Sequence, residues 1–181
     1  MKKYFVLLAM LAGSVQAQTF GSINSEFATG LKGASDQSGY LFTIGHKIDN
    51  VIVDANAETL VAETSRATVS RLEGGASLLV PSANGITPYV RTAMGLKTVG
   101  TKQFGYASIE PGVRIKAGPG TARLAWRYRG AVDSDNADTT RTWRVGYVLP
   151  VTKATDFNIA YEQARGDANY NGYMVGLTFR F

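Results

Sequence analysis

Charged side chains recur at every second position in several segments of this sequence, and arginine is frequent among them. In residues 121–130, for example, Arg123, Arg127 and Arg129 share one parity. Guanidinium groups gathered on one face can bind anionic solutes, or they can form ion pairs where carboxylates face them. The candidate lining residues chosen in this way are Glu26, Asp54, Glu58, Arg71, Glu73, Arg91, Glu110, Arg114, Lys116, Arg123, Arg127, Arg129 and Arg144.

These candidate acids and bases are unevenly distributed along the chain. Most of the candidate acids lie in the first four alternating segments, and most of the candidate bases lie in the fifth to the eighth. If the segments form the wall of one narrow interior, an acidic wall would face a basic wall, and the basic surplus would favour anions. The bases would then find their neutralising acids mostly on the far wall. Alternatively, the opposite charges meet across the axis and hold the interior shut, because buried charges require a partner or water.

Motifs for enzymatic, metal or phosphate chemistry are weak in comparison. His46 is the single histidine, and no nucleophile and carboxylate converge on it in the sequence pattern. The loop DSDNADTT, which begins at Asp133, lacks the glycine and the final glutamate of an EF-hand, and residues 95–102 depart from the phosphate-loop spacing. Residues 165–167 are Arg-Gly-Asp, a tripeptide of adhesion proteins, and three residues are too short a motif to indicate a function. We therefore expect no catalytic residue, no metal site and no cofactor.

The elements that must position the charged residues are short alternating segments. Alternation of apolar and polar residues indicates strands with two unlike faces. The 20 glycines and the many Thr, Val and Tyr residues suit strands and tight turns, and no window shows a helical period. The sequence predicts ten strands, at 19–28, 39–48, 51–62, 67–80, 86–97, 104–117, 121–130, 140–149, 154–164 and 170–181.

The connections between these strands alternate in character. Asn84-Gly85 and Pro119-Gly120 are typical of tight turns, and Asp49-Asn50 and residues 150–153 are also short. Between them lie more polar segments, among them GLKGASDQSG, TVGTKQ and AVDSDNADT. Short turns at one end, longer loops at the other and an even number of strands are the pattern of a bacterial outer-membrane barrel.

The two faces of the strands distinguish a membrane barrel from a secreted soluble β protein. Leu124, Trp126 and Tyr128 lie opposite the arginines of their strand, and similar aromatic positions recur in the next strand. A soluble protein would have to bury all these aromatics, whereas a membrane barrel exposes them to lipid and its interfaces. We therefore predict an all-β fold: a transmembrane antiparallel up-and-down β-barrel of ten strands, with eight or twelve strands as the alternatives.

The N-terminal segment predicts export. Residues 1–17 combine Lys2 and Lys3, a short apolar run and the small residue Ala17, which is the layout of a secretory signal peptide. We expect cleavage after Ala17, which leaves residues 18–181 as the barrel domain. Loss of the two lysines lowers the net charge from +5 to +3, and this weak basicity gives no reason to expect nucleic-acid binding. The sequence contains no cysteine, so stability must come from the fold.

The last strand ends in YMVGLTFRF and has one apolar face, made by Tyr173, Val175, Leu177, Phe179 and Phe181. This stretch resembles the assembly signal that the barrel-insertion machinery of the outer membrane reads. Over its whole length the mature chain resembles small Gram-negative outer-membrane β-barrel proteins, and its layout is most similar to the small substrate-specific porins of the oligogalacturonate-porin type. The resemblance implies Sec-dependent export to the outer membrane, with membrane lipid and the barrel-assembly machinery as partners.

The charged interior and the barrel fold together predict a narrow passive diffusion channel. Its lumen would be basic and would favour small anionic solutes. Eight strands are just wide enough to be filled by side chains, and sixteen leave an aqueous channel, so ten strands are near the closed end of this range. The alternative is a closed structural or surface-interaction barrel without transport activity.

Overall fold

The computed structural model describes residues 18–30, 35–82, 84–132, 139–167 and 169–181. The predicted signal peptide, residues 1–17, lies outside the described residues, and so do residues 133–138 of the DSDNADTT loop. Ten strands follow one another: β1 (Gln18–Thr29), β2 (Gln37–Ile48), β3 (Val51–Ala62), β4 (Thr68–Leu79), β5 (Ile86–Val99), β6 (Lys102–Ala117), β7 (Gly120–Ala131), β8 (Thr140–Pro150), β9 (Thr155–Gly166) and β10 (Tyr170–Arg180).

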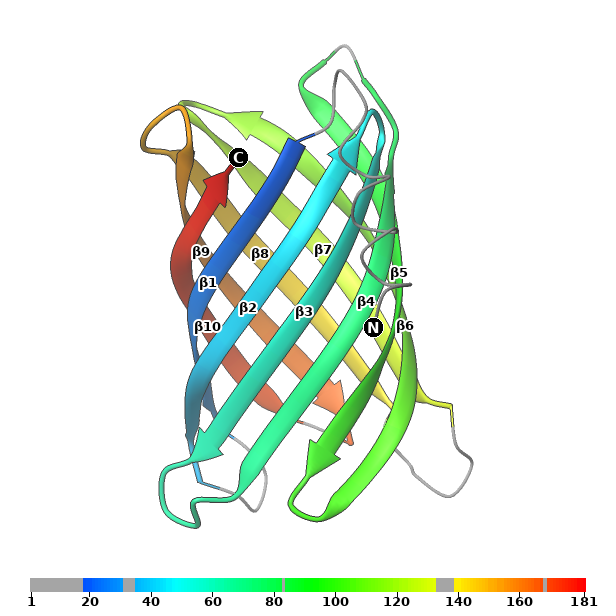
Figure 1. Ribbon diagram of the computed structural model, residues 1–181, viewed down its shortest axis with the longest axis vertical. Helices are drawn as coiled ribbons and strands as arrows, with labels where there is room; N and C mark the ends of the chain where they lie inside the picture. The colour runs from blue at the N-terminus through cyan, green and yellow to red at the C-terminus, as the bar shows by residue number, and fades with distance from the viewer. Residues whose placement is uncertain (1–17, 31–34, 83, 133–138, 168) are drawn as a thin grey trace, which may run out of the picture.

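The strands form one closed barrel in which each strand pairs with its neighbours in the sequence and β1 pairs with β10 (Figure 1). All ten pairings are antiparallel. The predicted up-and-down barrel of ten strands is therefore confirmed, and the alternatives of eight and twelve strands are wrong. Closure leaves no unpaired strand edge, which is the condition for crossing a bilayer with strands.

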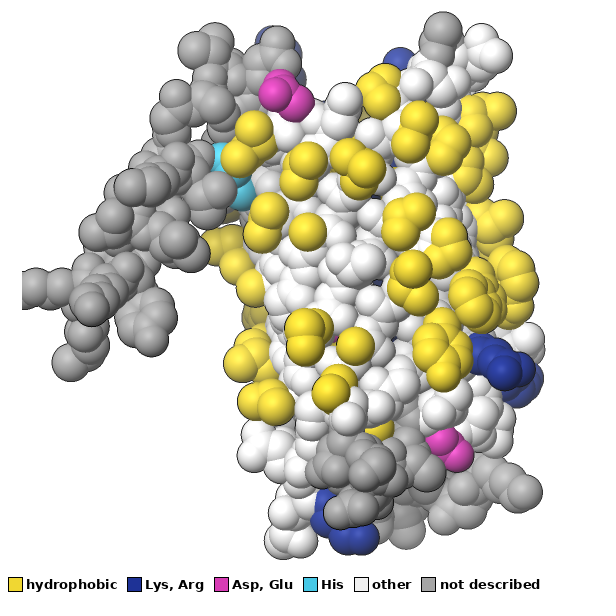
Figure 2. All heavy atoms as spheres, turned by 90° about the vertical axis from the view of Figure 1, so that its right-hand side faces the viewer, with side chains coloured by type: hydrophobic (Ala, Val, Ile, Leu, Met, Phe, Trp, Pro, Cys, Tyr) yellow, Lys and Arg dark blue, Asp and Glu magenta, His cyan; other side chains and the backbone are white. Residues whose placement is uncertain are grey.

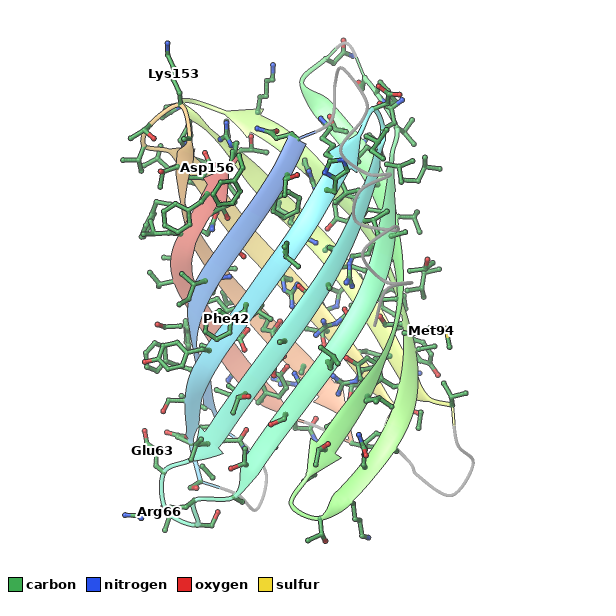
Figure 3. The ribbon with its side chains drawn as sticks, in the orientation of Figure 1. Phe42, Glu63, Arg66, Met94, Lys153 and Asp156 are labelled. Carbon is green, nitrogen blue, oxygen red and sulfur yellow. The ribbon has the colours of Figure 1, made fainter. Side chains whose placement is uncertain are left out.

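The two ends of the barrel differ in their connections. One end, here termed the turn end, carries the connections after β2, β4, β6 and β8, the start of β1 and the end of β10; the opposite end is termed the loop end (Figure 1). In Figure 3, Lys153 marks the turn end, and Glu63 and Arg66 mark the loop end.

One predicted loop is wrong, because TVGTKQ forms mostly strand. β5 continues to Val99 and β6 begins at Lys102, so only Gly100 and Thr101 remain for the turn. Gly100 has a φ of 60°, which glycine adopts without a steric penalty, and this allows the short connection. The other strand limits differ from the predicted ones by no more than two residues.

The outer wall of the barrel is apolar. Phe42 and Met94 project away from the wall in Figure 3, and they are 51% and 66% exposed. Figure 2 shows hydrophobic side chains spread over the middle of one face of the wall, between ends that carry the charged groups. In the part of the chain that the structure describes, no helix is long and apolar enough to cross a membrane. The outward apolar face is the surface that a membrane-spanning barrel presents to lipid.

Candidate functional site

The barrel encloses a cavity of about 860 Å³ that is reached from the turn end. Its wall runs from the turn residues Asp49, Asn50 and Pro81 to residues deeper in the barrel, such as Glu26 and Glu58. All thirteen candidate lining residues contribute side chains to this wall. Within the described residues, ten Lys or Arg and eight Asp or Glu line it, so the interior is polar and slightly basic. A role of these residues in conduction stays a prediction.

Inward-facing glycines make room for large side chains against the wall. A Cβ at Gly112 would lie 2.5 Å from the ring of Tyr89, and a Cβ at Gly95 would lie 2.8 Å from the ring of Tyr106. Both rings are therefore able to lie against the wall, and both tyrosines are only 2% exposed. Because the Tyr89 ring lies against the wall, the interior space next to it can hold charged side chains.

Arg91 joins acids from two other strands. Its Nε donates a hydrogen bond to Asp54 Oδ2 at 3.0 Å, and its Nη1 lies 2.6 Å from Glu73 Oε1. On β4, Arg71 Nη1 donates to Glu58 Oε1 at 2.5 Å. The side chains in these pairs are 8% to 13% exposed. Their charges are therefore largely withdrawn from water but paired, as buried charges must be.

Glu110 is the centre of a second network. Its side chain is 2% exposed, accepts a hydrogen bond from the Tyr89 hydroxyl at 3.0 Å and forms an ion pair with Arg123. Arg144 Nη1 lies 3.6 Å from the same carboxylate. Arg144 also donates to Glu162 Oε2, from Nε at 3.1 Å and from Nη2 at 2.7 Å. The network connects β5, β6, β7, β8 and β9 by side chains.

The expectation that the bases find their acids mostly on the far wall is wrong. Arg123 on β7 pairs with Glu110 on the adjacent β6, and Arg144 on β8 pairs with Glu162 on the adjacent β9. Side chains directly opposite on adjacent strands begin only about 5 Å apart. A guanidinium group therefore reaches a carboxylate along the wall before it can reach one across the lumen.

Arg114 and Arg127 differ from the other arginines of the cavity. Among the described residues, neither has a carboxylate within the 4.0 Å of an ion pair. The Arg114 guanidinium lies over the ring of Tyr89, with its central carbon 5.3 Å from the ring centroid. Arg127 interacts electrostatically with Glu73 and Glu110 at longer range. These two guanidinium groups are the best placed to meet an anion in the cavity.

Among the interior residues of the last two strands that the candidate list lacked, four form ion pairs or a hydrogen bond to a carboxylate: Asp156, Glu162, Tyr170 and Arg180. Asp156 forms an ion pair with Arg180 near the turn end, and the Tyr170 hydroxyl donates to Glu162 Oε1 at 2.6 Å. All four occupy even positions, on the face opposite the outward odd positions of residues 173–181. The alternation in the sequence was therefore a sufficient signal to find them.

The interior at the loop end is packed, and this part is termed the loop-end plug. Ala28, Ala164 and Tyr170 form one buried cluster in it. Arg71 of β4 lies within electrostatic range of Tyr170 of β10, so side chains from well-separated strands approach one another here. The plug comprises the buried residues Ala28, Leu60, Ala62, Tyr106, Thr140, Ala164 and Tyr170, and of these seven only Tyr106 also borders the cavity.

The weaker motifs are not members of the Arg91 and Glu110 networks. His46 Nδ1 lies 2.9 Å from Thr19 Oγ1, so its partner is a hydroxyl on β1 and not a carboxylate. Residues 95–102 span the tight turn between β5 and β6, and the tripeptide 165–167 begins in the last residues of β9. The described residues contain no group of three or more His, Cys, Asp or Glu side chains that could hold a metal ion. The absence of catalysis and of cofactors stays a prediction.

The five residues of the predicted assembly signal all lie on the outer face at the end of the chain, and all are exposed. The N–H of Phe181 donates to the carbonyl of Thr19 at 2.9 Å, which extends the pairing between β10 and β1. The Phe181 side chain itself is 82% exposed. It is thus accessible to a recognition partner, and its reading by the assembly machinery stays a prediction.

Deleting Phe181 is expected to reduce the amount of assembled barrel several-fold and to leave unassembled chain in the periplasm. The reason is that the barrel-insertion machinery would lack the terminal aromatic ring that it is expected to recognise. The Phe181→Tyr variant keeps a ring at the same place and should assemble normally. Immunoblots of membrane and periplasmic fractions measure both variants, and normal assembly of the deletion variant would show that the ring is not read.

No protein-family model matches this sequence, and no curated protein matches it. Among solved structures, the β domain of the Bordetella autotransporter BrkA is similar, with 13% identity and a TM-score of 0.55 over 90% of this chain and 98% of that chain. Neisserial surface protein A matches with 11% identity and a TM-score of 0.46 over 91% of this chain and 95% of that chain. The KdgM porin, in complex with disordered oligogalacturonate, matches with 6% identity and a TM-score of 0.47 over 91% of this chain and 99% of that chain. At such identities only the fold is shared, and the fold of this chain is that of an outer-membrane β-barrel.

Proposed function

We propose that this chain is an outer-membrane surface barrel that is closed to solutes at its loop end. The single observation that supports this most is the loop-end plug. The cavity wall ends at the level of Arg71 and Arg129. On the loop-end side of it, Ala28, Ala164 and Tyr170 form a buried cluster. Passive diffusion requires a continuous wet path through the barrel. If the path is interrupted, the protein can contact partners only through its outer wall and its loops. No reaction is assigned to it.

In this proposal the loop end faces the outside of the cell, because outer-membrane barrels place short turns in the periplasm and longer loops outside. The 860 Å³ cavity then opens to the periplasm. Its ion pairs tie strands that are adjacent or nearly adjacent, as Glu110 does for β6, β7 and β8. In this proposal the ion pairs give each buried charged side chain of the wall a partner where little water can reach it.

An anion channel is the second candidate, and a specific observation favours it. Arg114 and Arg127 lie in the cavity without a carboxylate at ion-pair distance among the described residues. Guanidinium groups of this kind concentrate small anions. If side chains of the plug moved aside, the basic surplus of the cavity would select anions over cations.

Swelling of proteoliposomes tests the proposal against this second candidate. Liposomes that contain the purified wild-type barrel should swell no faster than empty liposomes in isotonic solutions of a small neutral sugar or of a small organic anion. A general porin in parallel liposomes provides the positive control. Faster swelling with the anion would favour the anion channel, and faster swelling with both solutes would indicate an open, unselective path.

A further inference from the structure

Two arginines of the strands stand on the outer wall instead of in the interior. Arg141 on β8 and Arg165 on β9 are directly opposite each other in the register, and both are exposed. They share the parity of outward residues such as Trp143 and Tyr161. Every other Arg or Lys on a described strand occupies an inward position of its strand. The two outward cations are therefore also cross-strand neighbours.

This pair is unfavourable by itself. Like charges directly opposite each other on adjacent strands destabilise a sheet. Arg165 Nη1 donates to the carbonyl oxygens of Ala164 at 2.7 Å and Tyr170 at 3.4 Å, which fixes the side chain but does not neutralise its charge. Arg141 has no hydrogen-bond or ion-pair partner in the part of the chain that the structure describes. The pair thus lacks the anion that would remove the repulsion.

The pair lies at the level where lipid headgroups begin. Along β8 the next outward side chain toward the middle of the barrel is Trp143, which is 55% exposed, and along β9 Tyr161 follows Gln163. Tyr128 of β7 is the cross-strand neighbour of Arg141 on its other side. Aromatic residues mark the membrane interface of such barrels. Figure 2 shows the same order on the face it draws, with basic side chains beyond the hydrophobic band near the loop end.

We infer that Arg141 and Arg165 form a site for the phosphate group of an anionic lipid in the leaflet at the loop end. Two planar guanidinium groups side by side match the oxygens of a phosphate and neutralise it with directed hydrogen bonds. The lipid is favoured over phosphate from solution because the site lies on the lipid-facing wall, where headgroups stand at high local concentration. The inference depends on the barrel crossing the membrane and not on whether the interior conducts.

The test compares the purified barrel in nanodiscs of zwitterionic lipid with nanodiscs that also contain a phosphorylated lipid A. Native mass spectrometry should show retained lipid A on the wild-type protein. The double variant Arg141→Gln/Arg165→Gln should retain it roughly tenfold to thirtyfold less. The matched control Arg66→Gln/Lys153→Gln removes two exposed charges outside the strands and should retain as much as the wild type. Unchanged lipid A retention by the Arg141/Arg165 variant would overturn the inference.

Two further arms identify the source of the phosphate. Lipid A from which the phosphate groups have been removed should bind the wild-type and the Arg141/Arg165 variant equally weakly. Inorganic phosphate at millimolar concentration should not displace phosphorylated lipid A from the wild-type protein. If inorganic phosphate displaces the lipid completely, the site recognises free anions and the lipid assignment is wrong.

Discussion

The Glu110→Gln variant is expected to unfold with a free energy about 3 kcal/mol lower than that of the wild type. Glu110 is 2% exposed and is the anionic partner of both Arg123 and Arg144. Its replacement by a neutral amide leaves Arg123 without an ion-pair partner and leaves Arg144 with Glu162 as its one remaining carboxylate among the described residues. The value is at the low end for a broken buried pair because the Arg123 side chain is 30% exposed and can be rehydrated.

The measurement is urea-induced unfolding of the barrel in lipid vesicles. Trp126 and Trp143, which are paired across β7 and β8, report the loss of the lipid-facing wall by fluorescence. The control variant Asp156→Asn removes a carboxylate that is also buried, at 7% exposed, but that pairs with only one arginine, Arg180, whose side chain is 32% exposed. It deprives one arginine of a carboxylate instead of two and should therefore cost less than Glu110→Gln, about 1 kcal/mol. The double variant Glu110→Gln/Arg123→Gln should be more stable than Glu110→Gln alone, because it also removes the stranded charge of Arg123. Equal stability of Glu110→Gln and the wild type would show that water already solvates this network.

Shortening the two large side chains of the loop-end plug should convert the barrel from closed to conducting. Tyr106 and Tyr170 are 2% and 6% exposed; Tyr106 borders the cavity at its loop-end side, and Tyr170 packs with Ala28 and Ala164. The Tyr106→Ala/Tyr170→Ala variant removes both rings, so the cavity extends toward the loops and water can enter. Planar-bilayer recordings should then show discrete current steps, with anions favoured by the basic surplus of the wall.

Tyr89→Ala is the matched control for the plug variant. Tyr89 is an inward tyrosine that is also 2% exposed, but it lies on the cavity side, in contact with Arg114 and Arg123. Its removal widens the cavity and leaves the plug in place, so it should not conduct. A boiling-dependent shift in gel mobility verifies that each variant is folded. If Tyr89→Ala conducts and the plug variant does not, the barrier lies at the cavity side of the barrel and not at the loop end, which contradicts the proposal.

The alternation of residue types was enough to predict the fold and the inward face of the strands. A strand has a side-chain period of two, so one correctly assigned outward residue, such as Trp126, fixes the direction of all its neighbours on that strand. The same reasoning placed Arg114 and Arg144 in the interior, where the structure has them. The short turns were predictable from turn-forming residues such as Asn84-Gly85. The exception is Gly100, where a glycine with positive φ makes a short turn in place of the expected loop.

The partners of the charges and the packing of the plug could not be read from the sequence. Which carboxylate meets Arg91 depends on the register of β3, β4 and β5, and a shift of the register would change its partners. The plug depends on volumes that only the closed barrel defines. Ala28 and Ala164 are small residues that suggest open space in a sequence, but Tyr170 from the adjacent strand fills it.

The conductance of the wild-type protein in a planar lipid bilayer tests the central claim most directly, since that claim is closure at the loop end. The purified, folded barrel should insert without producing current steps, under the same salt and voltage at which the Tyr106→Ala/Tyr170→Ala variant conducts. Reproducible anion-selective steps from the wild-type protein, reversed in selectivity by Arg127→Glu/Arg144→Glu, would contradict closure and establish the anion channel.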